Sequence, residues 1–281
     1  MRIVRTVAEL RQWSRALRSQ AGNTIGLVPT MGALHAGHAS LMRAARASCS
    51  HFAVSIFVNP TQFGPNEDFA RYPRTFDADC ALAESEGADV VFAPAVEELY
   101  PSGAATFVEV CDLGNRLDGA SRPGHFRGVA TVVAKLLIAA EPDHAFFGQK
   151  DAAQVAVIRR MATDLRLASE IVVCPIVRDP DGLALSSRNV YLSQAERTQA
   201  LVLGRAVHLV EALVAAGECR SSILLSAAAL TLTTVPEVRI DYVVLVDWST
   251  LQPAEIATSG TLFAIAAWVG QNRLIDNAVV S

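Results

Sequence analysis

The strongest constraint on the fold is a regular alternation of short apolar runs with longer segments of helical spacing. Five runs rich in β-branched or aromatic residues are predicted to be strands: residues 24–28, 52–58, 89–93, 143–147 and 170–174. The segments predicted to be helices between them are residues 39–48, 76–85, 128–140 and 152–163. Such alternation predicts a parallel sheet, because each helix can return the chain to the same sheet edge. We expect an α/β fold with a Rossmann-like, doubly wound parallel sheet whose ligands lie at the carboxyl ends of the strands.

The pattern changes after Val177. A polar loop at 178–182 precedes a long helical pattern at 193–216, and the apolar runs 238–246 and 260–269 can pair as strands of a small sheet. A chain of 281 residues, 51% of them hydrophobic, can bury the core of a main domain with a smaller companion. The sequence therefore predicts two domains, residues 1–177 and a smaller α+β domain at 178–281.

Composition excludes several classes of partner and site. A net charge of −4 provides no basic field for a nucleic-acid backbone. The five cysteines are widely spaced without a Cys-x-x-Cys pair, which favours reduced thiols. The sequence has no apolar segment typical of a secretory signal, and its longest apolar stretches are too short to cross a bilayer. We expect a cytoplasmic protein whose partners are small molecules rather than nucleic acid or a membrane.

The most informative segment is Val28–His38, which follows a predicted strand and opens a predicted helix. The N–H groups at a helix N-terminus favour phosphate, and His35 and His38 lie three residues apart on one face of the first turn. Gly37 leaves a surface without a side chain against which a purine or ribose could pack. Two other interpretations remain open: histidines that only cap the helix, and a metal site, for which no nearby cysteine or acid completes the ligands.

Two further polar clusters follow predicted strands or mark the domain junction. In the first, Gly148–Gln154, Lys150 could contact a phosphate, Gln154 would face the same cleft, and Asp151 could either act there or simply cap the next helix. The second, Leu185–Asn189, offers two hydroxyls and a guanidinium that suit a triphosphate, although Ser-Ser-Arg-Asn is also ordinary turn sequence.

Neutral amides and a basic loop complete the candidates. Asn59 and Gln62 follow a predicted strand, where amides can orient a hydroxyl or carboxylate without adding charge. The loop at 122–129 carries two arginines and His125. For His125 and Arg127, a solvated loop and a ligand contact remain open alternatives.

Seven segments in order resemble the pantothenate synthetase, or pantoate–β-alanine ligase, family of the HIGH-motif nucleotidyltransferase superfamily. The resemblance covers nearly the whole chain. Its segments are PTMGALHAGH (29–38), FVNPTQF (57–63), RYPRT (71–75), RPGHFRGVATVVAKL (122–136), FFGQKDAAQ (146–154), LSSRN (185–189) and RLIDN (273–277).

The resemblance implies roles for individual residues. ATP binding is implied for Met31, Gly32, Ala33, Leu34, His35, Ala36, Gly37, His38, Gly148, Gln149, Lys150, Asp151, Val177, Leu185, Ser186, Ser187 and Arg188. Gln62 and Gln154 fall on the pantoate positions, with Gln62 also near β-alanine, and we expect Asn59 beside them. The expected catalytic donors to the phosphate oxygens are His38, His35, Lys150, Ser186, Ser187 and Arg188.

The implied reaction uses ATP to convert (R)-pantoate into a pantoyl adenylate, from which β-alanine displaces AMP to give pantothenate, a precursor of coenzyme A. Residues 1–177 would bind ATP and pantoate, and residues 178–281 would close the active site. Mg²⁺ is expected with ATP, held mainly by phosphate oxygens and water. Asp79 is interpreted as an exposed helical acid, with a metal contact as the alternative. A homodimer is also implied.

Two other functions compete with this interpretation. Another adenylyltransferase would need extra cationic residues for a phosphorylated acceptor, whereas the edge at Asn59 and Gln62 is neutral. A non-catalytic nucleotide sensor would bind ATP without releasing pyrophosphate. The departures from the family pattern are Gln149 for a common Glu, Leu185 for Met, Ala153 for Gln and Trp248 for Pro. We expect Trp248 to be remote from the ATP motifs and to affect packing only.

Overall fold

The computed structural model describes residues 1–65 and 67–280. Asn66 and Ser281, which fall in the two predicted domains, lie outside the described residues. The chain forms two compact units: unit 1 comprises Met1–Gly148 and Val157–Pro175, and unit 2 comprises Gln149–Ala156 and Ile176–Ser281. The segment 149–156 thus belongs to unit 2, and the predicted domain boundary at Val177 stays a proposal.

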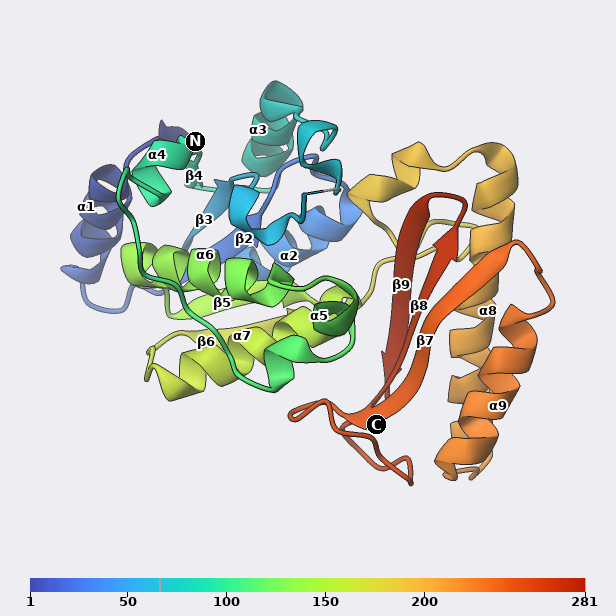
Figure 1. The fold of residues 1–281 in the computed structure, drawn as a ribbon. Coiled ribbons are helices and arrows are strands. Elements are labelled where there is room, and N and C mark those ends of the chain that lie inside the picture. Colours follow the sequence, from blue (N-terminus) through green and yellow to red (C-terminus); the bar gives the residue numbers. More distant parts are fainter. Residues whose placement is uncertain (66, 281) are drawn as a thin grey trace. The chain divides into compact units, whose positions relative to one another are not determined.

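Unit 1 contains a parallel sheet, which in the described residues has six strands in the order β1-β4-β3-β2-β5-β6 (Figure 1). The strands are β1 (Arg2–Val4), β2 (Ile25–Thr30), β3 (His51–Ile56), β4 (Val90–Phe92), β5 (His144–Gly148) and β6 (Glu170–Cys174). From β2 the chain proceeds through β3 to β4 on one side, and β5 and β6 lie on the other side. The strand order therefore reverses between β2 and β5, where a doubly wound sheet opens a ligand crevice at the carboxyl ends.

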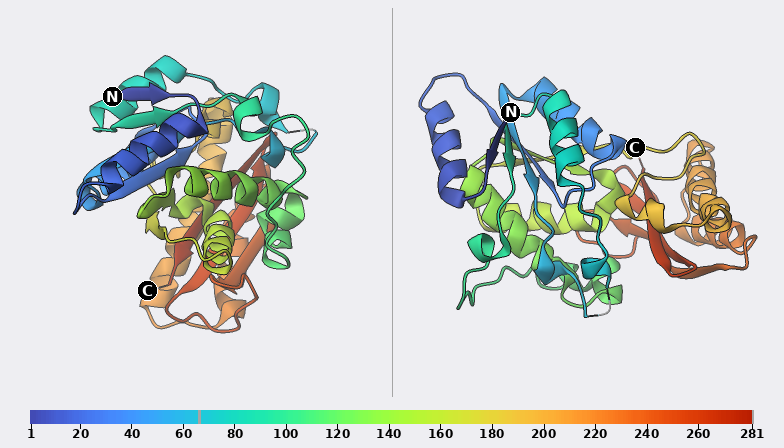
Figure 2. Two further views of the ribbon diagram at one scale, coloured as in Figure 1. Left: turned by 90° about the vertical axis from the view of Figure 1, so that its left-hand side faces the viewer. Right: turned by 90° about the horizontal axis from the view of Figure 1, so that it is seen from above.

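Helices cover both faces of this sheet. They are α1 (Val7–Arg18), α2 (Ala36–Ser48), α3 (Phe76–Ser85), α4 (Val96–Leu99), α5 (Asp118–Ser121), α6 (His125–Ala140) and α7 (Ala152–Asp164), which begins in unit 2. On one face α2 and α3 pack against Val28, Phe52 and Phe146. Strand alternation directs Leu27 and Ala53 to the opposite face, where α1 and α6 lie beside each other (Figures 1 and 2). Short 3₁₀ turns are η1 (Pro60–Gln62), η2 (Asp68–Ala70) and η3 (Leu113–Asn115).

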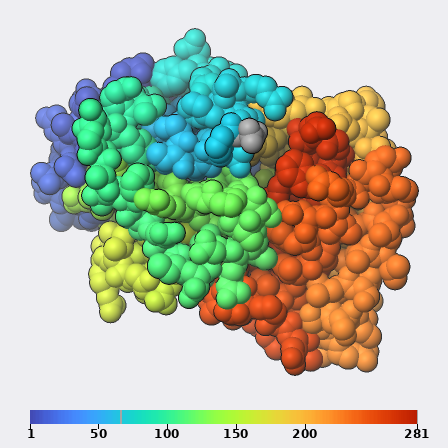
Figure 3. Space-filling view, viewed as in Figure 1, coloured from blue at the N-terminus to red at the C-terminus, as the bar shows by residue number. Residues whose placement is uncertain are grey.

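Unit 2 is built on an antiparallel sheet, three-stranded in the part of the chain that the structure describes, with the order β7-β8-β9. Its elements are η4 (Gln149–Asp151), η5 (Ser187–Tyr191), α8 (Gln194–Ala215), α9 (Ser221–Leu232), β7 (Val238–Asp247), β8 (Thr261–Val269) and β9 (Asn272–Val279). The helices α8 and α9 bury apolar side chains, among them Leu203 and Leu224, against Phe263 and Ile265 of β8. The helix α9 contributes to the orange surface in Figure 3. Leu230, which belongs to this helix, is exposed.

The structure confirms the predicted fold class, with a parallel sheet in unit 1 and a small α+β arrangement in unit 2. The predicted pairing of the runs near 238–246 and 260–269 is the β7–β8 ladder. Among the described residues, α8 is long and apolar enough to cross a membrane by length and composition. Its apolar residues, however, pack into the core of unit 2.

Candidate active site

The loop after β2 is held by a buried carboxylate. Asp79 of α3 is 2% exposed, and its oxygens accept hydrogen bonds from the backbone N–H of Ala33 (3.0 Å) and of Leu34 (2.8 Å). The hydroxyl of Thr75 also donates to it, at 3.0 Å. These bonds stabilise a turn in which Gly32 and Ala33 have φ of +81° and +50°, a region that favours glycine.

The expectation that Asp79 is an exposed helical acid was therefore wrong. Helical spacing identifies which face of a helix is apolar, but it cannot show that a loop lying 45 residues earlier covers a polar position. Both oxygens of Asp79 are engaged by donors, which argues against a metal contact. Within residues 1–65 and 67–280, no group of three or more His, Cys, Asp or Glu side chains could hold a metal ion.

His35 and His38 form a reciprocal cap at the start of α2. Nδ1 of His35 accepts from the N–H of Gly37 at 3.1 Å, and Nδ1 of His38 accepts from the N–H of His35 at 3.3 Å. A ring nitrogen that accepts carries no proton, so each neutral imidazole has its proton on Nε2. The ring centroids are 4.2 Å apart. The capping interpretation is thus correct for Nδ1, and it orients two Nε2–H donors at a helix N-terminus.

The side chain of Gln62 is held by Asn59, whose amide is fully hydrogen-bonded. Asn59, only 1% exposed, donates through Nδ2 to Oε1 of Gln62 (3.0 Å) and to the carbonyl of Gly128 (3.1 Å). Its Oδ1 accepts from the hydroxyls of Tyr100 and Thr61, each at 2.9 Å. These bonds use both ends of the Asn59 amide and fix the orientation of the Gln62 side chain. The predicted contact of Asn59 with substrate stays a prediction. The Nε2 group of Gln62 lies 3.1 Å from Sδ of Met31, in the loop after β2.

The backbone of Gln62 is fixed by a second network. Nδ1 of the buried His125 donates to the carbonyl of Gln62 at 2.9 Å, and its Nε2 accepts from Arg122 at 3.0 Å. Arg122 also donates to Glu67 at 2.7 Å. Burial, together with the charge of Arg122, lowers the pKa of His125 to about 4. Burial raises the pKa of Glu67, but the hydrogen bonds and charge of Arg122 outweigh it and leave that pKa below its usual value.

For His125 and Arg127, a solvated loop and a ligand contact were the open alternatives, and the structure gives the two residues different surroundings. His125 is a buried structural residue rather than part of a solvated loop. Arg127, which follows it by two residues, places its guanidinium 4.1 Å from the centroid of the Phe107 ring. These contacts do not support a role in substrate binding for either side chain.

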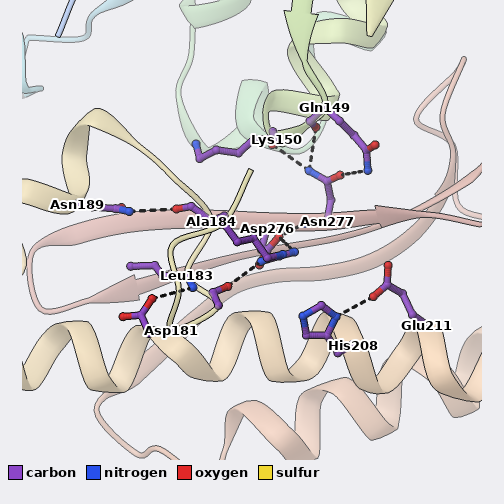
Figure 4. A network of polar contacts seen from close by, with 12 residues as sticks. Gln149, Lys150, Asp181, Leu183, Ala184, Asn189, His208, Glu211, Asp276 and Asn277 are labelled. Carbon is purple, nitrogen blue, oxygen red and sulfur yellow. Dashed lines mark hydrogen bonds and ion pairs between the residues drawn. The ribbon is translucent and has the colours of Figure 1, made fainter. Parts of the chain in front are cut away.

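In unit 2, the segment after β5 is fixed by the C-terminal strand. Asn277 of β9 donates to the carbonyls of Gln149 (3.0 Å) and Lys150 (2.9 Å), and its Oδ1 accepts from Nε2 of Gln149 at 3.2 Å (Figure 4). Nζ of Lys150 lies 3.6 Å from Oδ1 of Asp151, an ion pair in which Lys150 is 20% exposed. The start of α7 carries Gln154, which is half-buried.

Trp248 also contacts this segment. Its Nε1 donates to the carbonyl of Ala152, the first residue of α7, at 2.8 Å. The expectation that Trp248 is remote from the ATP motifs was therefore wrong, because the residue contacts the FFGQKDAAQ segment. That it affects packing only stays a prediction. The sequence alone could not reveal this contact, because the two residues are 96 positions apart.

The third cluster follows a tight hairpin in unit 2. The N–H of Leu185 donates to the carbonyl of Val177 at 2.9 Å, so these two residues face each other where the hairpin closes. Ser186 then caps η5, with its hydroxyl accepting from the N–H of Arg188 at 3.3 Å. Ser187 is the first residue of η5, so the serines and the arginine share one short turn.

The predicted site residues thus fall into one group in each unit. Unit 1 holds Met31, Gly32, Ala33, Leu34, His35, Ala36, Gly37, His38, Asn59, Gln62 and Gly148. Unit 2 holds Gln149, Lys150, Asp151, Gln154, Val177, Leu185, Ser186, Ser187 and Arg188. Residues that sequence reasoning missed are Asp79 as the support of the loop and Asn277 as the support of Lys150. The sequence did offer one signal for Asn277, because the polar pair Asp276-Asn277 interrupts the apolar run 274–280.

Comparisons with known proteins agree on one family. The model of the family described as pantoate-beta-alanine ligase matches residues 2–279. A pantothenate synthetase from Acidobacterium capsulatum is 58% identical, over 100% of this chain and 97% of that protein. One from Koribacter versatilis is 55% identical, over 100% and 96%.

Solved structures give the same result. A pantothenate synthetase from Thermus thermophilus has a TM-score of 0.94 and 47% identity, covering 100% of this chain and 99% of that one. A pantoate-beta-alanine ligase from Francisella tularensis, described as complexed with beta-gamma ATP and beta-alanine, has a TM-score of 0.80 and 33% identity, with coverage of 99% and 97%.

Proposed function

We propose that this chain, which belongs to the pantoate–β-alanine ligase family, uses residues of both units 1 and 2 in catalysis. The chain is a ligase that uses ATP to join pantoate to β-alanine. In the first step a carboxylate oxygen of pantoate attacks the α-phosphorus of ATP, and the bond to pyrophosphate breaks. In the second step the amine of β-alanine attacks the acyl carbon, loses a proton and displaces AMP.

The proposed ATP site rests on the cap of α2. His35 and His38 would donate through Nε2–H to phosphate oxygens, because their Nδ1 atoms accept backbone N–H groups. Lys150 and Arg188 would neutralise charge on the departing pyrophosphate, and the hydroxyls of Ser186 and Ser187 would donate hydrogen bonds to its oxygens. Charge moves onto phosphate oxygens in this step, so catalysis comes mainly from positioning and from such donors. The remaining ATP contacts, Met31–Gly37, Gly148–Asp151, Val177 and Leu185, would come from the loops around these groups.

Pantoate is proposed to bind at the neutral edge formed by Gln62, with Gln154 as a second contact. The Oε1 of Gln62 already accepts from Asn59, so its Nε2, which also lies 3.1 Å from Sδ of Met31, would be the group that donates to a substrate oxygen. A neutral edge suits a hydroxy acid better than a phosphorylated acceptor. This feature favours a carboxylate acceptor over the acceptors of other adenylyltransferases.

Mg²⁺ is proposed to arrive with ATP, bound by phosphate oxygens and water. The described residues fit this arrangement better than a protein metal site, since the oxygens of Asp79 accept from backbone and hydroxyl donors. We assign no step to the ion. A homodimer, a cytoplasmic location and closure of the active site by residues 178–281 complete the proposal, and light scattering of the purified protein tests the first of these.

The deciding experiment is exchange of labelled pyrophosphate into ATP with β-alanine omitted, which isolates adenylation. Exchange that requires pantoate is expected. Folded, ATP-binding protein that shows no exchange with pantoate would overturn the proposed route and favour a nucleotide sensor. Exchange driven by a phosphorylated acceptor instead would favour another adenylyltransferase.

A further inference from the structure

Two neighbouring side chains of β9 hold two separate segments of unit 2. Asp276 and Asn277 are 3% and 4% exposed, which is unusual for polar residues unless they are fully hydrogen-bonded. Consecutive residues of a strand point to opposite faces of the sheet. Asp276 pairs in register with Ile265, which belongs to the core beneath α8 and α9, whereas Asn277 pairs with Ala264. The two side chains therefore serve opposite faces of the same strand.

On one face, Asn277 binds two consecutive backbone carbonyls. Its Nδ2 donates to the carbonyls of Gln149 and Lys150, and its Oδ1 accepts from the side chain of Gln149. Three hydrogen bonds from one buried amide fix both the position and the direction of η4 (Figure 4). Such a clamp sets where the Lys150 side chain begins without touching its ammonium group.

On the other face, Asp276 fixes the hairpin that precedes η5. It accepts two hydrogen bonds from Arg178, at 2.7 and 2.9 Å, in the bidentate geometry that a guanidinium and a carboxylate favour. Arg178 also donates to the carbonyl of Gly182 at 3.1 Å, across the turn of the hairpin. The hairpin closes at Val177 and Leu185, directly before Ser186.

We propose that Asp276 and Asn277 are positioning residues for adenylation, with Asn277 setting the position of Lys150 and Asp276 that of the Ser186–Arg188 turn. The inference rests on the proposed function of Lys150 and of that turn. The strand β9, which supplies no group to the phosphates, thereby determines the spacing between Lys150 and the Ser186–Arg188 turn.

The test is a double-mutant cycle on Asn277 and Lys150, read by pantoate-dependent pyrophosphate exchange in the full chain. Asn277→Leu keeps a similar volume but removes every hydrogen bond to η4. We expect kcat/KM for ATP to fall by about 10- to 100-fold, with KM for pantoate nearly unchanged. In a Lys150→Ala background the same substitution should cost less than about threefold, because coupled residues are not additive.

Equal losses in both backgrounds would overturn the positioning role and indicate general destabilisation. A Lys150→Ala protein with normal exchange would instead contradict the proposed function of Lys150, so the two failures are distinguishable. If Asn277→Leu does not fold, the smaller Asn277→Ser is measured in the same cycle, with the same criteria.

Asp276→Asn provides the second arm, paired with Arg188→Ala in place of Lys150→Ala. The matched control is Asp241→Asn, which makes the same chemical change at an ion pair between β7 and Arg273 of β9. Asp241 contacts neither η4 nor the hairpin through that ion pair, so its variant should retain wild-type kcat/KM. A loss in Asp241→Asn equal to that in Asp276→Asn would contradict the inference for Asp276.

Discussion

A Cβ atom placed on Gly128 would lie 2.3 Å from the carbonyl oxygen of Thr61 and 2.6 Å from the amide nitrogen of Gln62. The helix α6 therefore contacts η1 backbone to backbone, and only glycine permits this approach. The contact allows the Gly128 carbonyl to accept from Asn59, which in turn orients Gln62.

Gly128→Ala should displace η1 from α6, because the clash is with backbone that cannot rotate away. We expect a loss of about 1–3 kcal/mol in the free energy of unfolding and a larger rise in KM for pantoate than for ATP. Denaturant titration and steady-state kinetics measure both. Gly114→Ala, where the nearest atom to the new Cβ is 3.9 Å away, is the matched control and should be tolerated.

His38→Ala should slow pyrophosphate exchange, because loss of a donor to the transition state should raise the activation free energy by about 2–4 kcal/mol. The two ring nitrogens can be tested separately. His38→Asn retains an acceptor near Nδ1, which caps α2, whereas His38→Gln can present an amide N–H near Nε2. We expect the Gln variant to be the more active; greater activity in the Asn variant would show that the cap matters more than the donor.

Asn59→Asp should weaken pantoate binding. The carboxylate oxygen that replaces Nδ2 would face Oε1 of Gln62 and the carbonyl of Gly128, where the amide now donates. Buried acceptors facing each other cost about 1–3 kcal/mol, so we expect Kd for pantoate to rise roughly 5- to 100-fold. Calorimetry of pantoate binding measures the effect, and unchanged affinity would contradict the assigned role of Asn59.

Stability should fall on mild acidification because of His125. Its pKa is about 4 in the folded chain and 6.5 in the reference state, so the unfolded chain binds the proton first as the pH falls below 6.5. His125 should cost no stability above pH 6.5, and near pH 4 it should lower the free energy of unfolding by about 3 kcal/mol. His125→Asn should flatten the pH dependence of the unfolding midpoint between pH 6.5 and 4; an unchanged slope would assign the effect to other groups.

Trp248→Phe should retain most of the packing of the indole but remove its bond to the Ala152 carbonyl. We expect a loss of about 0.5–1.5 kcal/mol in the free energy of unfolding and a rise in KM for ATP, because Ala152 follows Asp151 directly. The same loss of stability with an unchanged KM for ATP would mean that the bond supports the fold alone.

Sequence reasoning succeeded where local pattern and tertiary environment agree. Residues 76–85 have helical spacing and form α3 with those bounds, and the loop opened by Gly32 leads into α2 as expected. It failed for β9, where Arg273, Asp276 and Asn277 interrupt the apolar run and hide the strand. The partners of Asp276 and Asn277 lie 98 to 128 residues away, and no local pattern contains that information. The three residues of β1 were too few to predict a strand.

The long sequence separation of the Asn277 contacts also bears on the order of events during synthesis. The carbonyl of Lys150 meets its partner 127 residues later in the chain, so a ribosome must add all of β9 before η4 can be fixed. Unit 1 has its strands translated by Cys174, well before that point. Since a ligand stabilises a chain only after its site exists, ATP bound at the proposed site, which includes Lys150, would support folding only at a late stage, and the nascent chain would depend on its own core until then.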